Sequence, residues 1–282
     1  MASLSQAEKA KKLLALHHGP HILVLPNAWD VGSARIFEDA GFPAIATTSS
    51  GIANSLGYPD GQRISRSEML EVVERIAHAV AVPVTADMEA GYGTTVDAMA
   101  ETARGVIAAG AVGLNLEDSC GEDSGKLFDI PLQKEKIAAM IAAAKKMGIE
   151  LVLNARTDVY LENIGAPAER FDLAVERLNA YREAGAASLF APGVKDRETI
   201  GALARAVHGP LNILGTVGTP PVRDLEKLGV ARVTIGGGAM RATMGLASRI
   251  AKQLRDQGTL DLILEYLMPY SEANRLMAKR SD

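Results

Sequence analysis

The chain contains a single cysteine, Cys120, among its 282 residues. One thiol excludes an intramolecular disulfide and a cysteine-based zinc cluster. No segment has the roughly eighteen uninterrupted apolar residues of a membrane span, and the N-terminal residues 1–12 lack the apolar stretch of a signal peptide. We therefore expect a soluble cytoplasmic protein with no membrane partner, in which oxygen or histidine ligands would hold any metal.

The chain also lacks an excess of charge of one sign. It has 30 basic and 34 acidic residues, a net charge of −4 and no long run of either sign. Nucleic-acid-binding proteins usually carry patches of lysine and arginine, so nucleic acid is not an expected partner. The GxGxxG fingerprint of dinucleotide-binding folds is absent after the first predicted strand, where residues 26–30 read Pro-Asn-Ala-Trp-Asp.

What the chain does have is an alternation of helix-like and strand-like segments. Hydrophobic residues make up 48% of the sequence, enough for one domain over residues 1–282 to bury a large core. A helix-like segment meets a glycine just before an apolar run five times, which is typical of a helix end followed by a strand. These glycines are Gly41, Gly110, Gly148, Gly185 and Gly229.

Short apolar or β-branched runs predict eight strands. They are centred near Val24, Ile45, Val84, Asn115, Val152, Leu189, Ile213 and Thr234. Eight strands alternating with helices favour a (β/α)8 TIM-type barrel, an α/β fold, over about residues 20–240. A helical tail follows over 241–282. An open doubly wound sheet has the same alternation and is the alternative.

Local signals mark where elements begin and turn. Ser65 followed by Glu68 predicts a capping box ahead of a helix over 69–80, and Thr94 followed by Asp97 resembles one ahead of a helix over 98–109. The three glycines at 236–238 predict a tight turn, and a phosphate contact is the alternative.

Polar side chains close the predicted strands. Residues 47–51 read Thr-Thr-Ser-Ser-Gly, and the following strands end in Asp87 and Glu89, in Asn115 and Glu117, and in Asn154 and Arg156. Residues two apart share a strand face, and the active sites of α/β barrels lie at the carboxyl ends of the strands. We therefore expect these side chains to meet at the barrel mouth.

Three of these residues, Asp87, Glu89 and Glu117, are carboxylates, and the pattern predicts one cation among them, Arg156. Such a deficit of positive charge either raises a carboxyl pKa or is met by a bound ion. An all-oxygen site suits Mg²⁺, with Mn²⁺ as a substitute. The alternative is a scaffold in which Arg156 pairs with Glu117 and Asp87 caps the following turn. Arg156 could also grip a substrate carboxylate.

Several of these motifs, in this order and spacing, resemble those of the isocitrate lyase and phosphoenolpyruvate mutase superfamily. They are Ser50-Gly51-Ile52, Leu56-Gly57, Asp60, the 87–93 run, Leu116-Glu117-Asp118 and Asn154-Ala155-Arg156. The resemblance covers about residues 25–238. It implies a barrel whose last helix is exchanged between the subunits of a homodimer or homotetramer. It also implies Mg²⁺ bound to a small 2-oxo or 2-hydroxy carboxylate.

The resemblance also implies roles for single residues. Asp87 would bind the metal directly, while Asp60, Glu89 and Glu117 would hold metal-bound waters. Many relatives have Asp where this chain has Glu89, and the longer side chain could be a closer ligand.

Backbone amides near Ser50, Gly51 and Ile52 would bind the substrate's carboxylate or enolate oxygen. Arg156 would lie on the opposite side of the substrate, with Asn154 beside it. Preorganised donors of this kind stabilise a developing enolate.

The chain departs from the family in its loops. The Lys-(Lys/Arg)-Cys-Gly-His loop of the lyases is absent, and Cys120 follows Asp118 too closely to be its acid. The mutase loop is also missing, although residues 126–128 echo it, and the histidine that mutases carry after the sixth strand is replaced within 190–193. The polar segment 119–133 is typical of a mobile lid, with an ordinary surface loop as the alternative.

These features predict a carbon–carbon lyase or decarboxylase that acts through an enolate and releases pyruvate. Oxaloacetate and substituted malates are the expected substrates. Glu89, Tyr92 or a metal-bound water would serve as the base, and Arg156 would be a further catalytic residue. Carbon–phosphorus chemistry, as in a phosphonopyruvate hydrolase or a mutase, is an alternative. So are a non-catalytic 2-oxo-acid binder and a barrel without metal.

Overall fold

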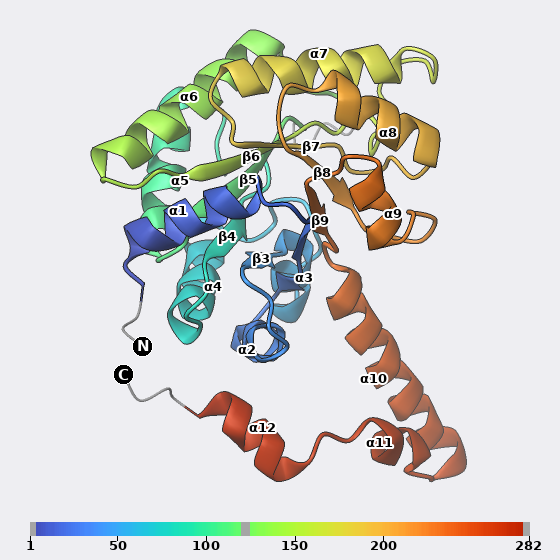
Figure 1. Cartoon of the computed structure of the whole chain (residues 1–282). Coiled ribbons are helices and arrows are strands. Elements are labelled where there is room, and N and C mark those ends of the chain that lie inside the picture. The colour runs from blue at the N-terminus through green and yellow to red at the C-terminus, as the bar shows by residue number, and fades with distance from the viewer. Residues whose placement is uncertain (1–3, 120–124, 279–282) are drawn as a thin grey trace.

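The computed structural model describes residues 4–119 and 125–278. Cys120 and part of the predicted lid lie outside these ranges. Parallel strands form a central sheet with helices around it (Figure 1). The strands are β1 (Leu23–Leu25), β2 (Asn27–Ala28), β3 (Ile45–Thr47), β4 (Val84–Asp87), β5 (Gly113–Glu117), β6 (Val152–Arg156), β7 (Ser188–Phe190), β8 (Leu211–Leu214) and β9 (Arg232–Thr234).

The sheet closes into a barrel. Its strand order is β1-β9-β8-β7-β6-β5-β4-β3-β2, so the two outermost strands are the two halves of one segment, interrupted at Pro26. Proline has no amide hydrogen to donate to a ladder, which accounts for the break. Because β1 pairs with β9 and β2 with β3, the predicted (β/α)8 barrel is confirmed and the open doubly wound sheet is wrong.

The helices surround the strands as the sequence pattern predicts. Around the barrel lie α1 (Gln6–Leu16), α2 (Val31–Asp39), α3 (Ser49–Ser55), α4 (Arg66–Ala79), α5 (Val96–Ala108), α6 (Ile130–Lys146), α7 (Arg170–Glu183), α8 (Arg197–Ala206) and α9 (Val222–Lys227). The five glycines predicted to end helices all have positive φ, which suits glycine because it has no Cβ.

One of the two predicted helix caps is correct. Ser65 and Glu68 form the capping box at the start of α4. The cap predicted at Thr94 is wrong by one residue, since the Thr95 side chain accepts the Ala98 amide at the start of α5. Both threonines offer the same hydroxyl, and the extended backbone at Thr95 decides which of them caps the helix.

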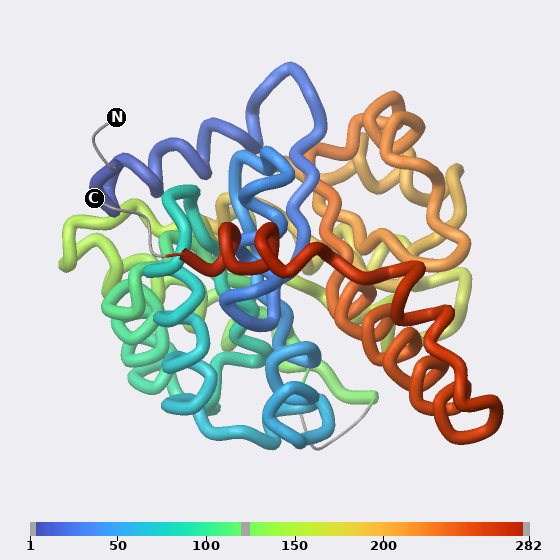
Figure 2. Tube along the Cα trace, turned by 90° about the horizontal axis from the view of Figure 1, so that it is seen from below, coloured from blue at the N-terminus to red at the C-terminus, as the bar shows by residue number. Residues whose placement is uncertain are grey.

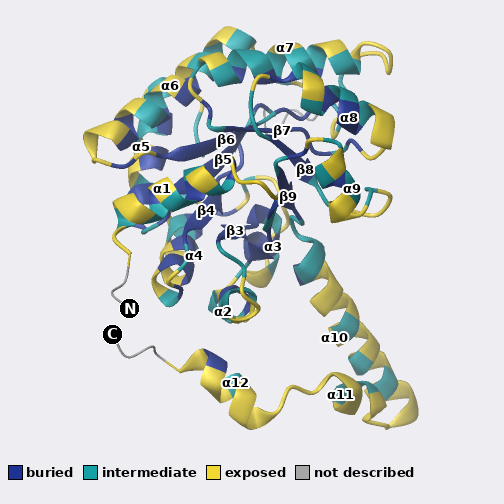
Figure 3. Ribbon diagram, viewed as in Figure 1, coloured by how far each residue is buried: buried dark blue, intermediate teal, exposed yellow. Residues whose placement is uncertain are grey.

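Burial is concentrated in the strands and the inner helix faces (Figure 3). The strand register places Asp87, Asn115 and Asn154 at one level on three neighbouring strands. Side chains at one level of adjacent parallel strands face the same side of the sheet. The carboxyl end of the barrel interior is therefore polar, as predicted, and this end forms the site.

After the barrel, the chain continues as a helical tail of α10 (Gly238–Gln257), α11 (Asp261–Tyr266) and α12 (Tyr270–Met277). This tail leaves the barrel and returns beneath α2, where Arg275 forms a two-pronged ion pair with Asp39 (Figures 1 and 2). Much of its surface is exposed (Figure 3). Within the described ranges, no helix has the length and apolar character needed to cross a membrane.

Candidate active site at the barrel mouth

Two neighbouring cavities open at the carboxyl ends of the strands. The deeper one, about 370 Å³, is lined by Asp87 and Asn115, and the outer one, about 200 Å³, by Glu89 and Glu117. Both are lined by Ser49, Asp60, Arg156 and Leu161. The four predicted metal-site carboxylates are therefore divided between two neighbouring cavities: Asp87 lines the deeper one, Glu89 and Glu117 line the outer one, and Asp60 lines both.

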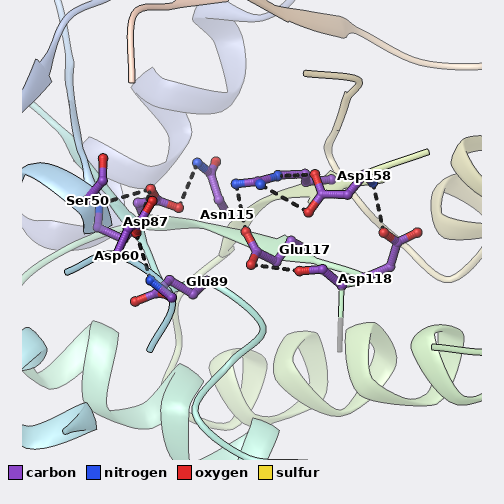
Figure 4. Close-up of polar contacts among 12 residues, drawn as sticks. Ser50, Asp60, Asp87, Glu89, Asn115, Glu117, Asp118 and Asp158 are labelled. Atoms are coloured by element: carbon purple, nitrogen blue, oxygen red, sulfur yellow. Dashed lines mark hydrogen bonds and ion pairs between the residues drawn. The ribbon is translucent and has the colours of Figure 1, made fainter. Parts of the chain in front are cut away.

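Asp87 is held from two sides. Its Oδ2 accepts hydrogen bonds from the Ser49 amide at 3.0 Å and the Ser49 hydroxyl at 2.8 Å, and its Oδ1 accepts one from Asn115 Nδ2 at 3.3 Å (Figure 4). Its own amide donates to Thr47 Oγ1. These bonds go to β3, α3 and β5, so the alternative in which Asp87 caps the turn that follows it is wrong. A carboxylate has about four acceptor positions, so Asp87 keeps capacity for a cation.

Asn154 lies one step behind this carboxylate. It is fully buried, and its Nδ2 donates to Asn115 Oδ1 at 2.8 Å. This bond orients the Asn115 amide so that its nitrogen faces Asp87. Asn154 lines neither cavity, and its predicted direct contact with substrate stays a prediction.

Glu117 and Arg156 are paired because β5 and β6 set them at the same level. Arg156 Nη1 lies 2.7 Å from Glu117 Oε2. The remaining edge of the guanidinium is bound by Asp158, whose two oxygens accept from Nε at 2.6 Å and Nη2 at 3.0 Å. The pairing of the scaffold alternative is thus present, and the Arg156 fork is occupied by protein carboxylates.

Burial and neighbouring charge act in opposite directions on this pair. Burial alone would lower the pKa of Arg156, but the charges of Asp158 and Glu117 raise it by more than burial lowers it. Arg156 therefore stays charged. Burial raises the pKa of Glu117 more than Arg156 lowers it, and Asp158 and Asp87 add repulsion. Two carboxylates share one guanidinium, and the pKa of Glu117 stays raised despite its ion pair.

Glu89 occupies a strained position in the loop after β4. Its φ is +49°, and both of its carboxylate oxygens accept hydrogen bonds, one from the Tyr92 hydroxyl at 2.8 Å and one from the Gln62 amide. Burial raises the pKa of Glu89 to about 7, and repulsion from Asp87 and Asp60 contributes to the rise while the two hydrogen bonds oppose it. Glu89 therefore titrates near neutral pH.

The carboxylates also repel one another around the deeper cavity. The pKa of Asp60 is raised, first by burial and then by the charge of Asp87. In the described part of the chain, no three His, Cys, Asp or Glu side chains are grouped so as to hold a metal ion directly. Mg²⁺ usually keeps several waters and takes only one or two protein carboxylates. The carboxylate oxygens of Asp60 and Asp87, which line one cavity, are ligands of the kind that such an ion takes.

The segment expected to bind substrate is divided. Ser50 lines the deeper cavity, whereas the Gly51 amide bonds to Thr48 Oγ1 at 3.3 Å and the Ile52 amide to the Thr48 carbonyl at 3.0 Å. A Cβ at Gly51 would lie 2.6 Å from Thr48 and 3.0 Å from Trp29, so only glycine fits there. That the amides near Ser50, Gly51 and Ile52 bind a substrate oxygen stays a prediction.

The structure adds cations that sequence reasoning missed, so the expectation of one cation is wrong. Lys126 lines the outer cavity, Arg241 the deeper one, and Arg232 lies fully buried inside the barrel. Lys126 lies within the predicted lid, and Arg241 lies past the last strand. Arg232 is the first residue of β9, and no local signal in the sequence indicates that it is buried.

Sequence reasoning also missed two further polar residues. Asp158 lies two residues after Arg156, the spacing that lets it bind the guanidinium edge. Asn27 joins the seam of the barrel, because its Oδ1 accepts from the amides of Ile235 and Gly236 while its Nδ2 donates to the Thr47 carbonyl. Pro26, which interrupts the first strand segment just before Asn27, was the sequence feature that could have indicated where the barrel closes.

Comparison with known proteins agrees with the geometry. The family model described as phosphoenolpyruvate phosphomutase matches residues 13–255. A Burkholderia cenocepacia J2315 structure described as a lyase/mutase superposes with a TM-score of 0.91 at 38% identity, covering 98% of each chain.

Two curated relatives are also similar over most of their length. An uncharacterized protein of Mycobacterium tuberculosis H37Rv is 36% identical over 89% of this chain and 92% of its own. An oxaloacetate decarboxylase of Rhodopseudomonas palustris BisB5 is 33% identical over 82% of this chain and 79% of its own.

Other relatives include 2-methylisocitrate lyases from bacteria and an archaeon. Lyases and mutases of one superfamily thus match almost the whole barrel and the start of the tail. The chain belongs to the phosphoenolpyruvate phosphomutase family, within the isocitrate lyase and PEP mutase superfamily of enzymes.

Proposed function

We propose that this enzyme is a Mg²⁺-dependent carbon–carbon lyase or decarboxylase acting in the cytoplasm. Its substrate is a small 2-oxo or 2-hydroxy carboxylate, oxaloacetate-like or malate-like, and pyruvate is the product. The observation that carries the proposal is that Asp87 and Asp60 line one cavity, where burial and then the charge of Asp87 raise the pKa of Asp60. Such repulsion is relieved when a divalent cation binds between the carboxylates.

A bound Mg²⁺ would polarise the oxo group and stabilise the negative charge of the enolate. Asp87, fixed by Ser49 and Asn115, would be its direct protein ligand, and Asp60, Glu89 and Glu117 would hold its waters. Mn²⁺ would substitute.

The other residues act on substrate and proton. Ser50 borders the cavity at the amino end of α3 and offers a donor to the substrate oxygen, and Arg156 provides a permanent positive charge opposite. In decarboxylation of an oxaloacetate-like substrate, the electron pair of the broken bond forms the enolate of pyruvate and CO₂ leaves. In cleavage of a substituted malate, the 2-hydroxyl group loses its proton, its carbon becomes the oxo carbon of pyruvate, and the electron pair forms the enolate of the second carboxylate product. Glu89, with a pKa of about 7, exists in both protonation states near neutral pH. It can therefore take the proton of a 2-hydroxyl group or return one to the enolate carbon.

Carbon–phosphorus chemistry is the second candidate, and a specific observation favours it. Lys126 lines the outer cavity beside Glu117 and Arg156, so a second cation is placed where a phosphonate group could be neutralised. The matching family model is itself that of a phosphomutase.

The first experiment would measure pyruvate release with a lactate dehydrogenase couple. Oxaloacetate, 2-methylisocitrate, 2,3-dimethylmalate and phosphonopyruvate would each be tested with Mg²⁺ and with EDTA. We expect release from oxaloacetate or a substituted malate that EDTA abolishes. Release from phosphonopyruvate alone would favour the second candidate.

Two variants serve as controls for that assay. Asp87→Asn keeps the shape of the side chain but removes the metal-binding charge, and we expect it to lose both Mg²⁺ binding and turnover. Asp224→Asn changes a carboxylate whose ion pair with Arg197 lies on α9 and α8, outside the two cavities, and we expect it to behave as wild type. A protein that binds pyruvate with Mg²⁺ but turns over no panel member would instead be a non-catalytic binder.

We also propose a homodimer or homotetramer assembled through the tail. Leu264, Leu267 and Tyr270 are exposed by 66%, 62% and 84% of their surface in the single chain. An apolar stretch of this kind commonly marks a protein–protein contact. A helix exchanged with a second copy would cover it.

A further inference from the structure

Three strained residues meet at the mouth of the outer cavity. In the described part of the chain, four residues other than glycine have positive φ, and three of them are Gln62 (+55°), Glu89 (+49°) and Tyr92 (+56°). Each such conformation costs about 1–2 kcal/mol for a residue with a side chain. It persists only where surrounding interactions hold it.

The three residues hold one another in a ring of hydrogen bonds. The Gln62 amide donates to Glu89 Oε2, the Tyr92 hydroxyl donates to Glu89 Oε1 at 2.8 Å, and the Tyr92 amide donates to Gln62 Oε1 at 2.9 Å. Both carboxylate oxygens of Glu89 are therefore fixed. Gln62 contributes a backbone donor to one partner and a side-chain acceptor to the other.

The ring joins two loops that are far apart in the sequence. Gln62 lies in the segment between α3 and α4, two residues after Asp60, and Glu89 and Tyr92 lie in the segment between β4 and α5. Asp60, Gln62 and Glu89 all line the outer cavity. Holding Gln62 therefore also sets the place of Asp60 relative to Glu89.

The residue type at position 62 indicates that its side chain is needed. Glycine adopts positive φ without strain and would still present its amide to Glu89. Gln62 adopts positive φ despite the strain, and its side-chain carbonyl oxygen accepts a hydrogen bond from the Tyr92 amide. Gly61, just before it, also has positive φ (+95°), so the backbone here turns sharply to aim this amide.

We infer that Gln62 is a positioning residue that docks the Asp60-bearing loop onto Glu89 and Tyr92 and so sets the spacing of the carboxylates around the cation. This inference rests on the proposed metal site. Groups that orient metal ligands or their waters typically change metal affinity by about 10–100-fold when they are replaced. Gln62 acts through the groups that it holds, Glu89, Tyr92 and Asp60.

The test compares Gln62→Gly and Gln62→Met with wild type. Glycine removes both the side chain and the strain, and methionine keeps the length of the side chain but removes the acceptor. Mn²⁺ binding, followed by calorimetry, is the first readout, and amide hydrogen exchange of residues 57–64 without metal is the second. We expect both variants to bind Mn²⁺ at least about tenfold more weakly and to exchange faster in this loop.

Asn163→Gly is the matched control, because Asn163 has the remaining positive φ (+55°) and lines neither cavity. It should bind Mn²⁺ as wild type does, which separates relief of strain from loss of the ring. Tyr92→Phe removes only the hydroxyl bond to Glu89, and we expect it to increase exchange less than Gln62→Gly does.

The outcomes separate this inference from the proposed function. If Asp87→Asn loses Mn²⁺ binding while both Gln62 variants keep wild-type affinity and exchange, the positioning role is wrong and the metal site stands. If Asp87→Asn also binds Mn²⁺ normally, both proposals are wrong. Weaker binding by both Gln62 variants at an unchanged melting temperature supports the role of Gln62.

Discussion

Nη2 of Arg232 lies 3.5 Å from Oδ1 of Asn115, inside the barrel. Through the Asn115 amide this contact reaches Asp87, so a buried guanidinium stands two hydrogen bonds from the predicted metal ligand. Burial lowers the pKa of Arg232 to about 9, while the charge of Asp87 opposes that fall. Nε and Nη1 of Arg232 have no hydrogen-bond partner among the described residues.

This arrangement predicts that Arg232→Met will not destabilise the fold. A buried charge that lacks part of its hydrogen bonds carries a desolvation cost, and an apolar side chain of similar length removes that cost. We expect the melting temperature in saturating Mg²⁺ to equal or exceed that of wild type. A fall of more than about 3 °C, on the order of 1 kcal/mol for a domain of this size, would show that Arg232 supports the barrel.

Glu89 contributes to the pH dependence of stability, together with Glu117 and Asp60, whose pKa values are also raised. Its folded-state pKa of about 7 lies above its ordinary value of 4.5, so the folded state binds a proton that the unfolded state has already lost. The stabilisation is complete below about pH 4.5 and is lost as the pH rises through about 7. In EDTA we therefore expect the unfolding free energy to fall between pH 5 and pH 8, by at most about 3 kcal/mol from Glu89.

Two comparisons test the origin of this slope. Glu89→Gln removes one of the titrating groups and should make the slope shallower. Mg²⁺ should oppose the loss at high pH because it neutralises the carboxylates. The measurement is urea unfolding at several pH values. An unchanged slope in Glu89→Gln would contradict the assignment to this residue.

Asp158 provides a prediction about the buried ion pair. It binds two nitrogens of Arg156, and its side chain is 1% exposed. In Asp158→Asn one charged partner of a buried guanidinium is lost, so we expect a loss of about 1–3 kcal/mol in unfolding free energy. Asp224→Asn, which alters a more exposed pair, should lose no more than about 1 kcal/mol. Equal losses in the two variants would show that Asp158 does not hold Arg156.

Much of the barrel and of the candidate site follows from local sequence signals. Glycines such as Gly41 end helices because glycine adopts positive φ without strain, which is a property of the residue itself. Asn115 and Glu117 are two residues apart, so they face the same side of their strand regardless of which strands lie beside it. The pairing of Glu117 with Arg156 needed the register between β5 and β6, which the sequence suggests but does not specify.

Other features depend on the closed barrel itself. Arg232 reads as an ordinary residue at the start of a strand, and its burial results from the inward direction that closure gives to its side chain. The ring of Gln62, Glu89 and Tyr92 depends on three backbone angles that no local pattern predicts. The placement of Asp60 follows from that ring.

The tail gives the last prediction, which concerns assembly. Leu264 on α11 is 66% exposed in the single chain, and a contact with a second copy would bury it. We expect Leu264→Lys to shift the protein from a dimer or tetramer towards a smaller species in light scattering coupled to size-exclusion chromatography. A lysine placed in an apolar interface is buried without a partner, at a cost of several kcal/mol. Met147→Lys, at an exposed site that follows α6, is the matched control and should leave the mass unchanged. A wild-type protein that is already monomeric would contradict the proposed exchange of helices.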